Sequence, residues 1–198
     1  MDKTIKLPDP QKELEFPLMK ALEKRRTVRK WKDAPLSKQE ISNLLWASCG
    51  ISKQKYGNVK SKRTAPSACN SQEIRVYVIM KEGVYLYNEE DHELVEIITN
   101  DIRKNIGTQK MMKSAPVGLV YVADLSRMKS PFLKNREAQR FCAWVDTGYI
   151  SQNVYLFCAA SNLGTAVLSL VDREKLHTLM KLEEHEKIVL TQVIGHLI

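Results

Sequence analysis

Three arginines and a threonine lie within five residues near the start of this 198-residue sequence: Arg25, Arg26, Thr27 and Arg29. Guanidinium groups offer paired donors to a phosphate or to the polar edge of a heterocycle, and the threonine hydroxyl adds a further donor. Positive charge is also favourable at the solvated end of a helix. Anion binding and a basic helix end are therefore both open.

A second candidate is the loop APSACNSQ at residues 65–72, which includes Ser67 and Asn70 and leads into an apolar segment. Side-chain amides both donate and accept hydrogen bonds, so they can pair with a heterocycle whose edge carries both kinds of atom. An ordinary polar turn would have the same composition.

A third group is Asp146, Gly148, Gln152 and Asn153, within a long apolar segment of helical periodicity. Small residues such as Gly148 let a flat ligand approach the backbone closely. Helix packing would explain the same residues, so none of the three groups identifies a chemistry by itself.

Local periodicity predicts the elements that position these groups. Residues 1–16 contain two prolines and no sustained period, which indicates an extended arm before a single domain at 17–198. Helices are predicted from Pro17 to Arg25, from the capping box Ser37-x-x-Glu40 to Gly50, over 94–112, from Phe141 to Asn162 with Gly164 as the stop, and from Asp172 to Met180. Strands are predicted over 74–80, 84–87, 117–123, 165–170 and 187–194.

Hairpin and crossover connections both occur in this order, which predicts an α+β domain with a mixed sheet. Segment 117–123 is expected to be a strand buried on both faces, and 141–162 to be a long, buried central helix. The polar, basic segment 125–140 has no clear period, so we expect a mobile lid there.

Composition excludes several classes of protein. The net charge of +8 comes from clusters at 24–32 and 53–63, without one basic stripe interleaved with aromatics, which argues against a nucleic-acid partner. No apolar run approaches the roughly 20 residues of a membrane span. The four cysteines have no metal-site spacing and are expected to be buried thiols, and the four histidines are expected at the surface.

The N-terminal residues lack the apolar stretch of a secretory signal, so we expect a cytoplasmic protein. Export is expected instead if a leader peptide has been removed from the sequence.

The order of these features resembles the FMN-dependent nitroreductase family over about residues 18–196. RRTVR is similar to that family's R-R-S-x-R signature, with threonine for serine, and PSACNSQ is similar to its P-S-x-x-N-x-Q loop. The resemblance implies a mainly antiparallel central sheet flanked by helices and a bound FMN. The side chains expected at the flavin are Arg25, Arg26, Thr27, Arg29, Ser67 and Asn70, with backbone amides near Leu168, Ser169 and Leu170.

Within the family, segments 43–47, 62–67 and 83–87 look most like the branch of azoline dehydrogenases, which oxidise thiazoline and oxazoline rings. Many nitroreductases continue beyond the last strand with a basic residue that reaches the FMN phosphate, whereas this sequence stops at Ile198. We therefore expect Arg25, Arg29 and a lid cation to hold the phosphate. The candidate lid cations are Lys134, Arg136 and Arg140.

The resemblance also implies a homodimer with the flavin at the subunit interface. NADH or NADPH would reduce the flavin, leave, and be replaced by a nitro, quinone or related acceptor. No G-x-G-x-x-G fingerprint follows a strand, which fits one shared site. Flavin N5 needs no protein nucleophile, so no catalytic side chain or metal is expected, and Arg25 or Arg29 would stabilise the reduced ring.

Two other functions remain open at this point. One is an FMN-dependent dehydrogenase or oxidase of peptide azolines or of another small molecule. The other is a flavin-binding protein without turnover.

Overall fold

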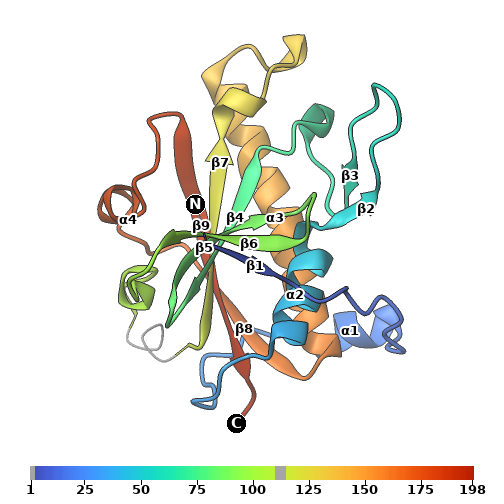
Figure 1. The fold of residues 1–198 in the computed structure, drawn as a ribbon, viewed down its shortest axis with the longest axis vertical. Helices are drawn as coiled ribbons and strands as arrows, with labels where there is room; N and C mark the ends of the chain where they lie inside the picture. Colours follow the sequence, from blue (N-terminus) through green and yellow to red (C-terminus); the bar gives the residue numbers. More distant parts are fainter. Residues whose placement is uncertain (1–2, 110–114) are drawn as a thin grey trace.

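The structure is a computed structural model that describes residues 3–109 and 115–198. Its centre is a seven-stranded sheet in the order β1-β6-β5-β4-β7-β9-β8, in which all six pairings are antiparallel (Figure 1). The strands are β1 (Thr4–Lys6), β4 (Ile74–Met80), β5 (Gly83–Asn88), β6 (Glu93–Ile98), β7 (Val117–Asp124), β8 (Leu163–Leu168) and β9 (Glu186–His196). The predicted α+β fold with a mainly antiparallel sheet is confirmed.

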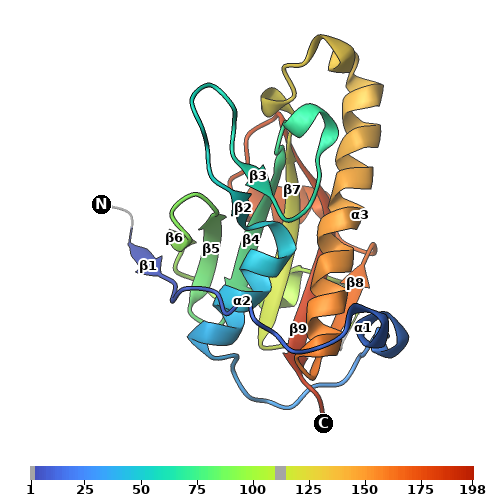
Figure 2. The ribbon, with the colours of Figure 1, turned by 90° about the vertical axis from the view of Figure 1, so that its right-hand side faces the viewer.

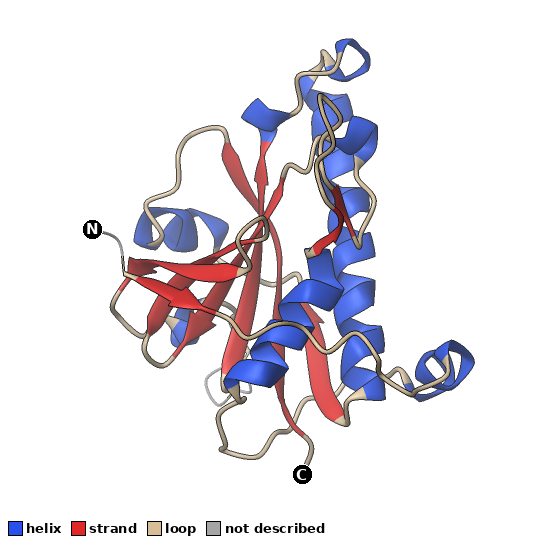
Figure 3. Ribbon diagram, turned by 45° about the vertical axis from the view of Figure 1, so that its right-hand side comes forward, coloured by secondary structure: helices blue, strands red, loops and turns tan. Residues whose placement is uncertain are grey.

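Helices flank this sheet on both faces (Figure 3). The α-helices are α1 (Leu18–Lys24), α2 (Lys38–Cys49), α3 (Arg136–Ala160) and α4 (Arg173–Leu179). Short 3₁₀ turns are η1 (Ala68–Asn70), η2 (Arg103–Asn105), η4 (Leu125–Arg127) and η5 (Pro131–Leu133), and β2 (Ile51–Lys53) pairs with β3 (Lys62–Arg63) in a separate ribbon. No helix in the described part of the chain is long and apolar enough to cross a membrane.

Side chains along a strand point alternately to the two faces of the sheet, which explains how this one sheet packs against a layer on each face. In β4, Val76 and Val78 pack into the core cluster shared with α2 and α3, whereas Tyr77 and Ile79 join the cluster that contains Leu176 of α4. β7 alternates in the same way and is buried along nearly its whole length. The prediction of a strand buried on both faces is confirmed.

Helix α2 begins as the sequence predicts. The Ser37 hydroxyl accepts a hydrogen bond from Glu40 N at 3.2 Å, and Glu40 Oε2 accepts one from Ser37 N at 2.7 Å. This capping box satisfies backbone donors at the start of the helix that would otherwise lack partners.

The predicted helix at 94–112 is wrong. Residues Glu93–Ile98 form β6, which pairs with β5 on one side and β1 on the other, and within residues 99–109 only η2 is helical. Its β-branched residues suit a strand, and the pairing of two neighbours outweighs the helical spacing of the apolar positions. Residues 110–112 of that prediction lie outside the described residues.

The long helix α3 starts five residues earlier than predicted and ends two residues earlier. The side chain of Asn135 caps it by accepting from Ala138 N at 2.7 Å. Asn162, with φ of 55°, follows its end, and Gly164 lies inside β8 rather than acting as the stop. The helix is also not buried all round, because Phe141 and Trp144 are 65% and 61% exposed.

Segment 125–140, which we expected to be a mobile lid, packs against the rest of the protein through several residues. Leu125, Met128 and Leu133 are buried, and the side-chain amide of Gln139 donates to the carbonyl of Leu133 at 2.9 Å. Two short helical turns and the first turn of α3 therefore replace the mobile segment that the sequence pattern suggested.

Two expectations about single residues also need correction. Cys69 is exposed and Cys142 is partly exposed, whereas Cys49 and Cys158 are buried as predicted. His92 is half-buried, with Nε2 2.8 Å from the Ser42 hydroxyl and Nδ1 2.8 Å from the Tyr87 hydroxyl. Its burial lowers the pKa of the imidazole, which supports a neutral, structural histidine.

A buried hydrogen-bonded chain ties the three strands at one side of the sheet together. The Tyr121 hydroxyl donates to Gln192 Oε1 at 2.6 Å, and Gln192 Nε2 donates to the Thr165 hydroxyl at 3.0 Å. All three residues are buried, so each polar atom depends on the next for a partner.

We predict that Tyr121→Phe lowers the free energy of unfolding by about 1–3 kcal/mol, because it leaves the Gln192 carbonyl without its donor. Urea denaturation followed by circular dichroism measures this change. The control is Tyr85→Phe, at a buried tyrosine whose hydroxyl makes no hydrogen bond to any described residue. Equal losses in both variants would contradict the role given to the chain.

Candidate functional site

The arginine segment, residues 25–29, leaves α1 and runs along the outer edge of β8. Val28 N donates to the carbonyl of Thr165 at 2.9 Å. The approach is so close that a Cβ at Gly164 would lie 2.8 Å from Val28 Cγ1. The glycine therefore allows the segment to lie against the sheet, which fixes where its side chains begin.

Tyr155 of α3 holds this segment from the other side. Its hydroxyl is 3.0 Å from the Thr27 hydroxyl and accepts a hydrogen bond from Val167 N at 3.2 Å, and the Arg25 guanidinium lies 5.4 Å from its ring centroid. Sequence reasoning missed Tyr155. The only signal was its place one turn after Ser151 and Gln152 on the predicted helix, since its partners come from two distant segments.

A cavity of about 590 Å³ opens beside the segment. Three cations, Lys24, Arg25 and Arg26, line it together with Tyr155 and a single carboxylate, Glu23. The excess of positive charge makes it suitable for an anionic group such as a phosphate. Arg29, farther along the segment, is exposed.

The predicted backbone contacts at 168–170 follow the end of β8 directly. Leu168 is its last residue and is buried, whereas Ser169 and Leu170 are exposed. The strand ends two residues earlier than predicted, and the Leu170 carbonyl accepts a hydrogen bond from Thr108 N at 3.3 Å. They end or directly follow the strand whose Thr165 contacts Val28, so they lie on the same side of the molecule as the arginine segment.

The second predicted group, loop 66–72, has a strained backbone. Cys69, Asn70 and Gln72 all have positive φ, at 52°, 50° and 53°. Left-handed residues other than glycine cost roughly 1–2 kcal/mol each, with asparagine the best tolerated. Three within four residues require a dense set of contacts, and such strain is typical of ligand-binding loops.

Side-chain hydrogen bonds supply these contacts. The Ser67 hydroxyl accepts from Gln72 N at 3.0 Å, and the Asn70 and Gln72 amides both donate to the Ser61 carbonyl, at 3.1 and 2.6 Å. Arg127 donates to the Gln72 carbonyl at 2.8 Å. Ser67 and Asn70 are thus brought together as predicted, although their hydrogen bonds are within the loop and to the adjacent Ser61.

Asp146 attaches this loop to α3. Its Oδ2 accepts from Ala68 N at 2.8 Å, and it is only 4% exposed. Glu73, which directly follows the loop, is fully buried. Burial and the nearby charge of Glu73 raise the pKa of Asp146 to about 7, against the opposing hydrogen bond from Ala68.

Within one chain, the arginine segment and loop 66–72 lie apart. Asp146 and Tyr155 are nine residues apart on α3, which corresponds to about 14 Å along the axis and to opposite sides of the helix. Figure 2 shows the loop before β4 beside the upper half of α3, and α1 beside its lower end.

One face of α3, before and just after Asp146, is apolar and exposed. It carries Phe141, Trp144, Val145 and Tyr149, with Gly148 among them open to solvent. Residues spaced three and four apart share one side of a helix, so these side chains form one continuous stripe.

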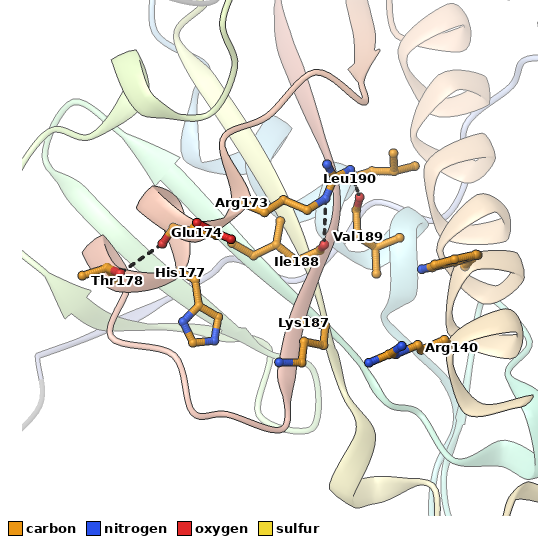
Figure 4. A pocket seen from close by; sticks show the side chains of 10 residues that line it. Arg140, Arg173, Glu174, His177, Thr178, Lys187, Ile188, Val189 and Leu190 are labelled. Carbon is orange, nitrogen blue, oxygen red and sulfur yellow. Dashed lines mark hydrogen bonds between the residues drawn. The ribbon is translucent and has the colours of Figure 1, made fainter. Parts of the chain in front are cut away.

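A separate basic cleft of about 790 Å³ lies between α3, α4 and β9 (Figure 4). Arg140 and Lys187 point into it, and Arg173 donates to the carbonyls of Ile188 and Val189 at 3.1 and 2.8 Å. Arg140 lies fifteen residues before Tyr155, or about 22 Å along the helix, so within one chain it does not meet the arginine segment. The other two candidate lid cations, Lys134 and Arg136, lie farther still along the chain and are exposed.

The described residues contain no group of three or more histidine, cysteine or acidic side chains that could hold a metal ion.

We predict that Tyr155→Phe loosens the arginine segment, because Thr27 loses its partner and Val167 N its acceptor. Amide exchange at residues 25–29 and 167 should speed up by about 5- to 30-fold, which corresponds to the 1–2 kcal/mol of two lost hydrogen bonds. Hydrogen exchange with mass spectrometry measures this. Tyr56→Phe, at an exposed position far from α3 in the sequence, is the control, and unchanged exchange in both variants would contradict the assignment.

Solved structures of other proteins share this fold. A nitroreductase-family protein from Ralstonia eutropha JMP134 is 32% identical, with a TM-score of 0.90 over 100% of this chain and 90% of the other. Two more distant structures share the fold, each over 90% of this chain. The NADPH:FMN oxidoreductase of Vibrio harveyi, complexed with NAD+, has 16% identity and a TM-score of 0.65 over 68% of its chain. The McbBCD microcin synthetase complex of Escherichia coli has 19% identity and a TM-score of 0.71 over 73% of the matched chain.

The family model described as "Nitroreductase family" matches residues 22–196, which include the arginine segment, the strained loop and all of α3. These matches support the family and leave the azoline dehydrogenase branch unconfirmed. The chain belongs to the nitroreductase family of oxidoreductases.

Proposed function

We propose that this protein is an FMN-dependent oxidoreductase that takes electrons from NADH or NADPH and passes them to a small nitro, quinone or related acceptor. We also propose that it works as a homodimer, with each flavin held by the arginine segment of one copy and the strained loop of the other. The observation that carries the proposal is the pair of polar sites on opposite sides of α3, a helix that also presents an exposed apolar stripe.

The arginine segment suits the phosphate end of FMN. Lys24, Arg25 and Arg26 surround a cavity large enough for a phosphate and part of its ribityl chain. Thr27 lies beside Val167 near the end of β8, where Ser169 and Leu170 follow and would meet the ring, whereas the chain from Val28 to Lys32 runs towards the start of the strand.

The strained loop suits the other side of the ring. Asn70 and Ser67 are partly exposed and lie in a backbone that hydrogen bonds hold rigid. A preorganised amide loses little entropy on meeting a flat heterocycle, which favours binding.

A second copy explains the separation of the two halves. The stripe of Phe141, Trp144, Val145 and Tyr149 is an exposed apolar surface of the kind that marks a protein interface. If two α3 helices pack through this stripe around a twofold axis, each loop can approach the arginine segment of the opposite copy. The flavin then lies where neither chain alone closes the site.

When bound, FMN supplies the hydride-accepting and electron-donating chemistry. The protein binds and orients it, and the positive charge of Arg25 or Arg29 favours the anionic reduced form. Both substrates would use the same exposed face in turn, in a ping-pong cycle.

We predict that the purified protein, reconstituted with FMN, shows visible flavin bands that bleach when NADH or NADPH is added without oxygen. Arg25→Ala should raise the Kd of FMN by about 10- to 100-fold, because a charge-assisted hydrogen bond contributes about 1.5–3 kcal/mol. Titration of flavin fluorescence measures the Kd, and Lys55→Ala, on the exposed ribbon loop, is the control.

Failure of FMN to bind would contradict the site. Bound FMN that neither nicotinamide reduces would contradict the reductase assignment and favour a dehydrogenase of another small molecule, such as a peptide azoline, or a binding protein without turnover.

A further inference from the structure

We propose that the basic cleft between α3, α4 and β9 binds the anionic group of the oxidising substrate, and that the acceptors of this protein are planar aromatic acids. The inference deepens the proposed function and rests on it in placing a flavin ring near residues 168–170. Binding of an acid in the cleft depends only on groups that this chain itself supplies.

The cleft exists because β8 stops before β9 does. Leu168, the last residue of β8, pairs with Thr191, and β8 is the edge strand of the sheet, so no described strand covers β9 at residues 186–190. The side chain of Arg173 takes this place. Its Nε and Nη2 donate to the carbonyls of residues 188 and 189, at 3.1 and 2.8 Å, which fixes a guanidinium group at the wall of the cleft.

Two further cations line the same cleft. Arg140 of α3 and Lys187 of β9 point into it (Figure 4). Neither forms an ion pair with any residue that the structure describes, and Glu186, the neighbour of Lys187, is buried in an ion pair elsewhere. Among the described lining residues Glu174 is the one carboxylate, so positive charge is in excess.

This charge suits a carboxylate. A guanidinium group presents parallel N–H donors that match the two carboxylate oxygens, and an ammonium group adds a point charge with three donors. Like charges gathered in one cleft repel each other, and a bound anion removes that repulsion.

The other walls of the cleft are apolar and suit a flat ring. Trp144, one turn after Arg140 on α3, lines it together with Ile188 and Leu190 of β9. An aromatic ring can stack on the indole, and the volume of about 790 Å³ is ample for a small-molecule ligand. A ribose-phosphate chain would instead leave polar groups against these walls, so an aromatic acid fits better than the sugar-phosphate part of a nicotinamide nucleotide.

The cleft also borders the place proposed for the flavin ring. Arg173 lies three residues after Leu170 in the chain, and the uncovered part of β9 begins directly beside Thr191, the partner of Leu168. Trp144 belongs to the exposed stripe through which two copies would pack. An acid bound in the cleft would therefore lie between the dimer interface and segment 168–170.

The first test uses flavin-free protein and two probes of similar size, 4-nitrobenzoate and the neutral 4-nitrobenzamide. Wild type should bind the acid about 3- to 30-fold more tightly than the amide, because exposed charges contribute less than buried ones. Isothermal titration calorimetry measures both Kd values.

Lys187→Glu should abolish this preference, and Arg140→Gln, on the exposed surface of α3, should reduce it independently. The control is Lys175→Glu, which makes the same change of charge on the exposed side of α4 outside the cleft and should keep the preference. Circular dichroism checks that each variant is folded.

The second test uses the protein with FMN bound. Reduction of either probe to its nitroso form consumes NADPH and a proton and releases NADP+ and water. Lys187→Glu should raise the KM for the acid by about 3- to 30-fold and leave kcat, the KM for the amide and the KM for NADPH nearly unchanged. Comparing the acid-to-amide ratio of kcat/KM between proteins cancels the intrinsic difference in reactivity of the two probes.

Equal Kd values for acid and amide in wild type, or the same loss of preference in Lys175→Glu, would overturn the proposal. A higher KM for NADPH with an unchanged KM for the acid would assign the cleft to the nicotinamide nucleotide and overturn it as well. Sedimentation velocity covers the remaining occupant, because a weaker dimer with an unchanged Kd for the acid would assign the cleft to the second copy. Acid preference in a protein that binds no FMN would leave the acid site standing and remove the proposed flavin.

Discussion

Helix α3 sets a fixed distance between two groups that a single ligand would need to contact together. It is 25 residues long, and its rigid geometry places Asp146 and Tyr155 about 14 Å apart on opposite sides. The two groups of residues that we propose contact the flavin are each attached to α3 at one of these positions. The arginine segment and β8 depend on Tyr155, and the strained loop depends on Asp146. In the proposed dimer, the exposed apolar stripe on the same helix would bring the two halves together.

The two halves are organised by different physical means. The arginine segment is extended and is held by contacts with β8 and Tyr155, which leaves its guanidinium groups beside an open cavity. The loop is compact and stores strain, which its internal hydrogen bonds and the contact of Ala68 N with Asp146 offset. An arginine segment that can adjust and a rigid loop that carries amide side chains would together bind a molecule with an anionic tail and a flat ring. This division of roles supports the proposal of FMN.

Much of this arrangement could be predicted from local sequence. The capping box at Ser37, the central strands and both polar clusters depend on residues close together in the chain, and each was located. The helix predicted over 94–112 failed because pairing with β1 and β5 decided the conformation of β6. Tyr155 and Glu73 were missed for a related reason. A half-buried tyrosine and a glutamate just before a strand look ordinary in sequence, because the contacts that distinguish them come from distant segments.

The most direct test of the central claim is complementation between two inactive variants. One copy carries Arg25→Ala with Arg29→Ala, the other carries Asn70→Ala with Ser67→Ala, and differently tagged forms are co-expressed and purified as mixed dimers. If each flavin site uses the arginine segment of one copy and the loop of the other, a mixed dimer has one intact site. The account predicts that it binds about one FMN per dimer and regains about half of the wild-type reduction by NAD(P)H. Mixed dimers as inactive as either parent, or a protein that stays monomeric while binding FMN, would contradict it.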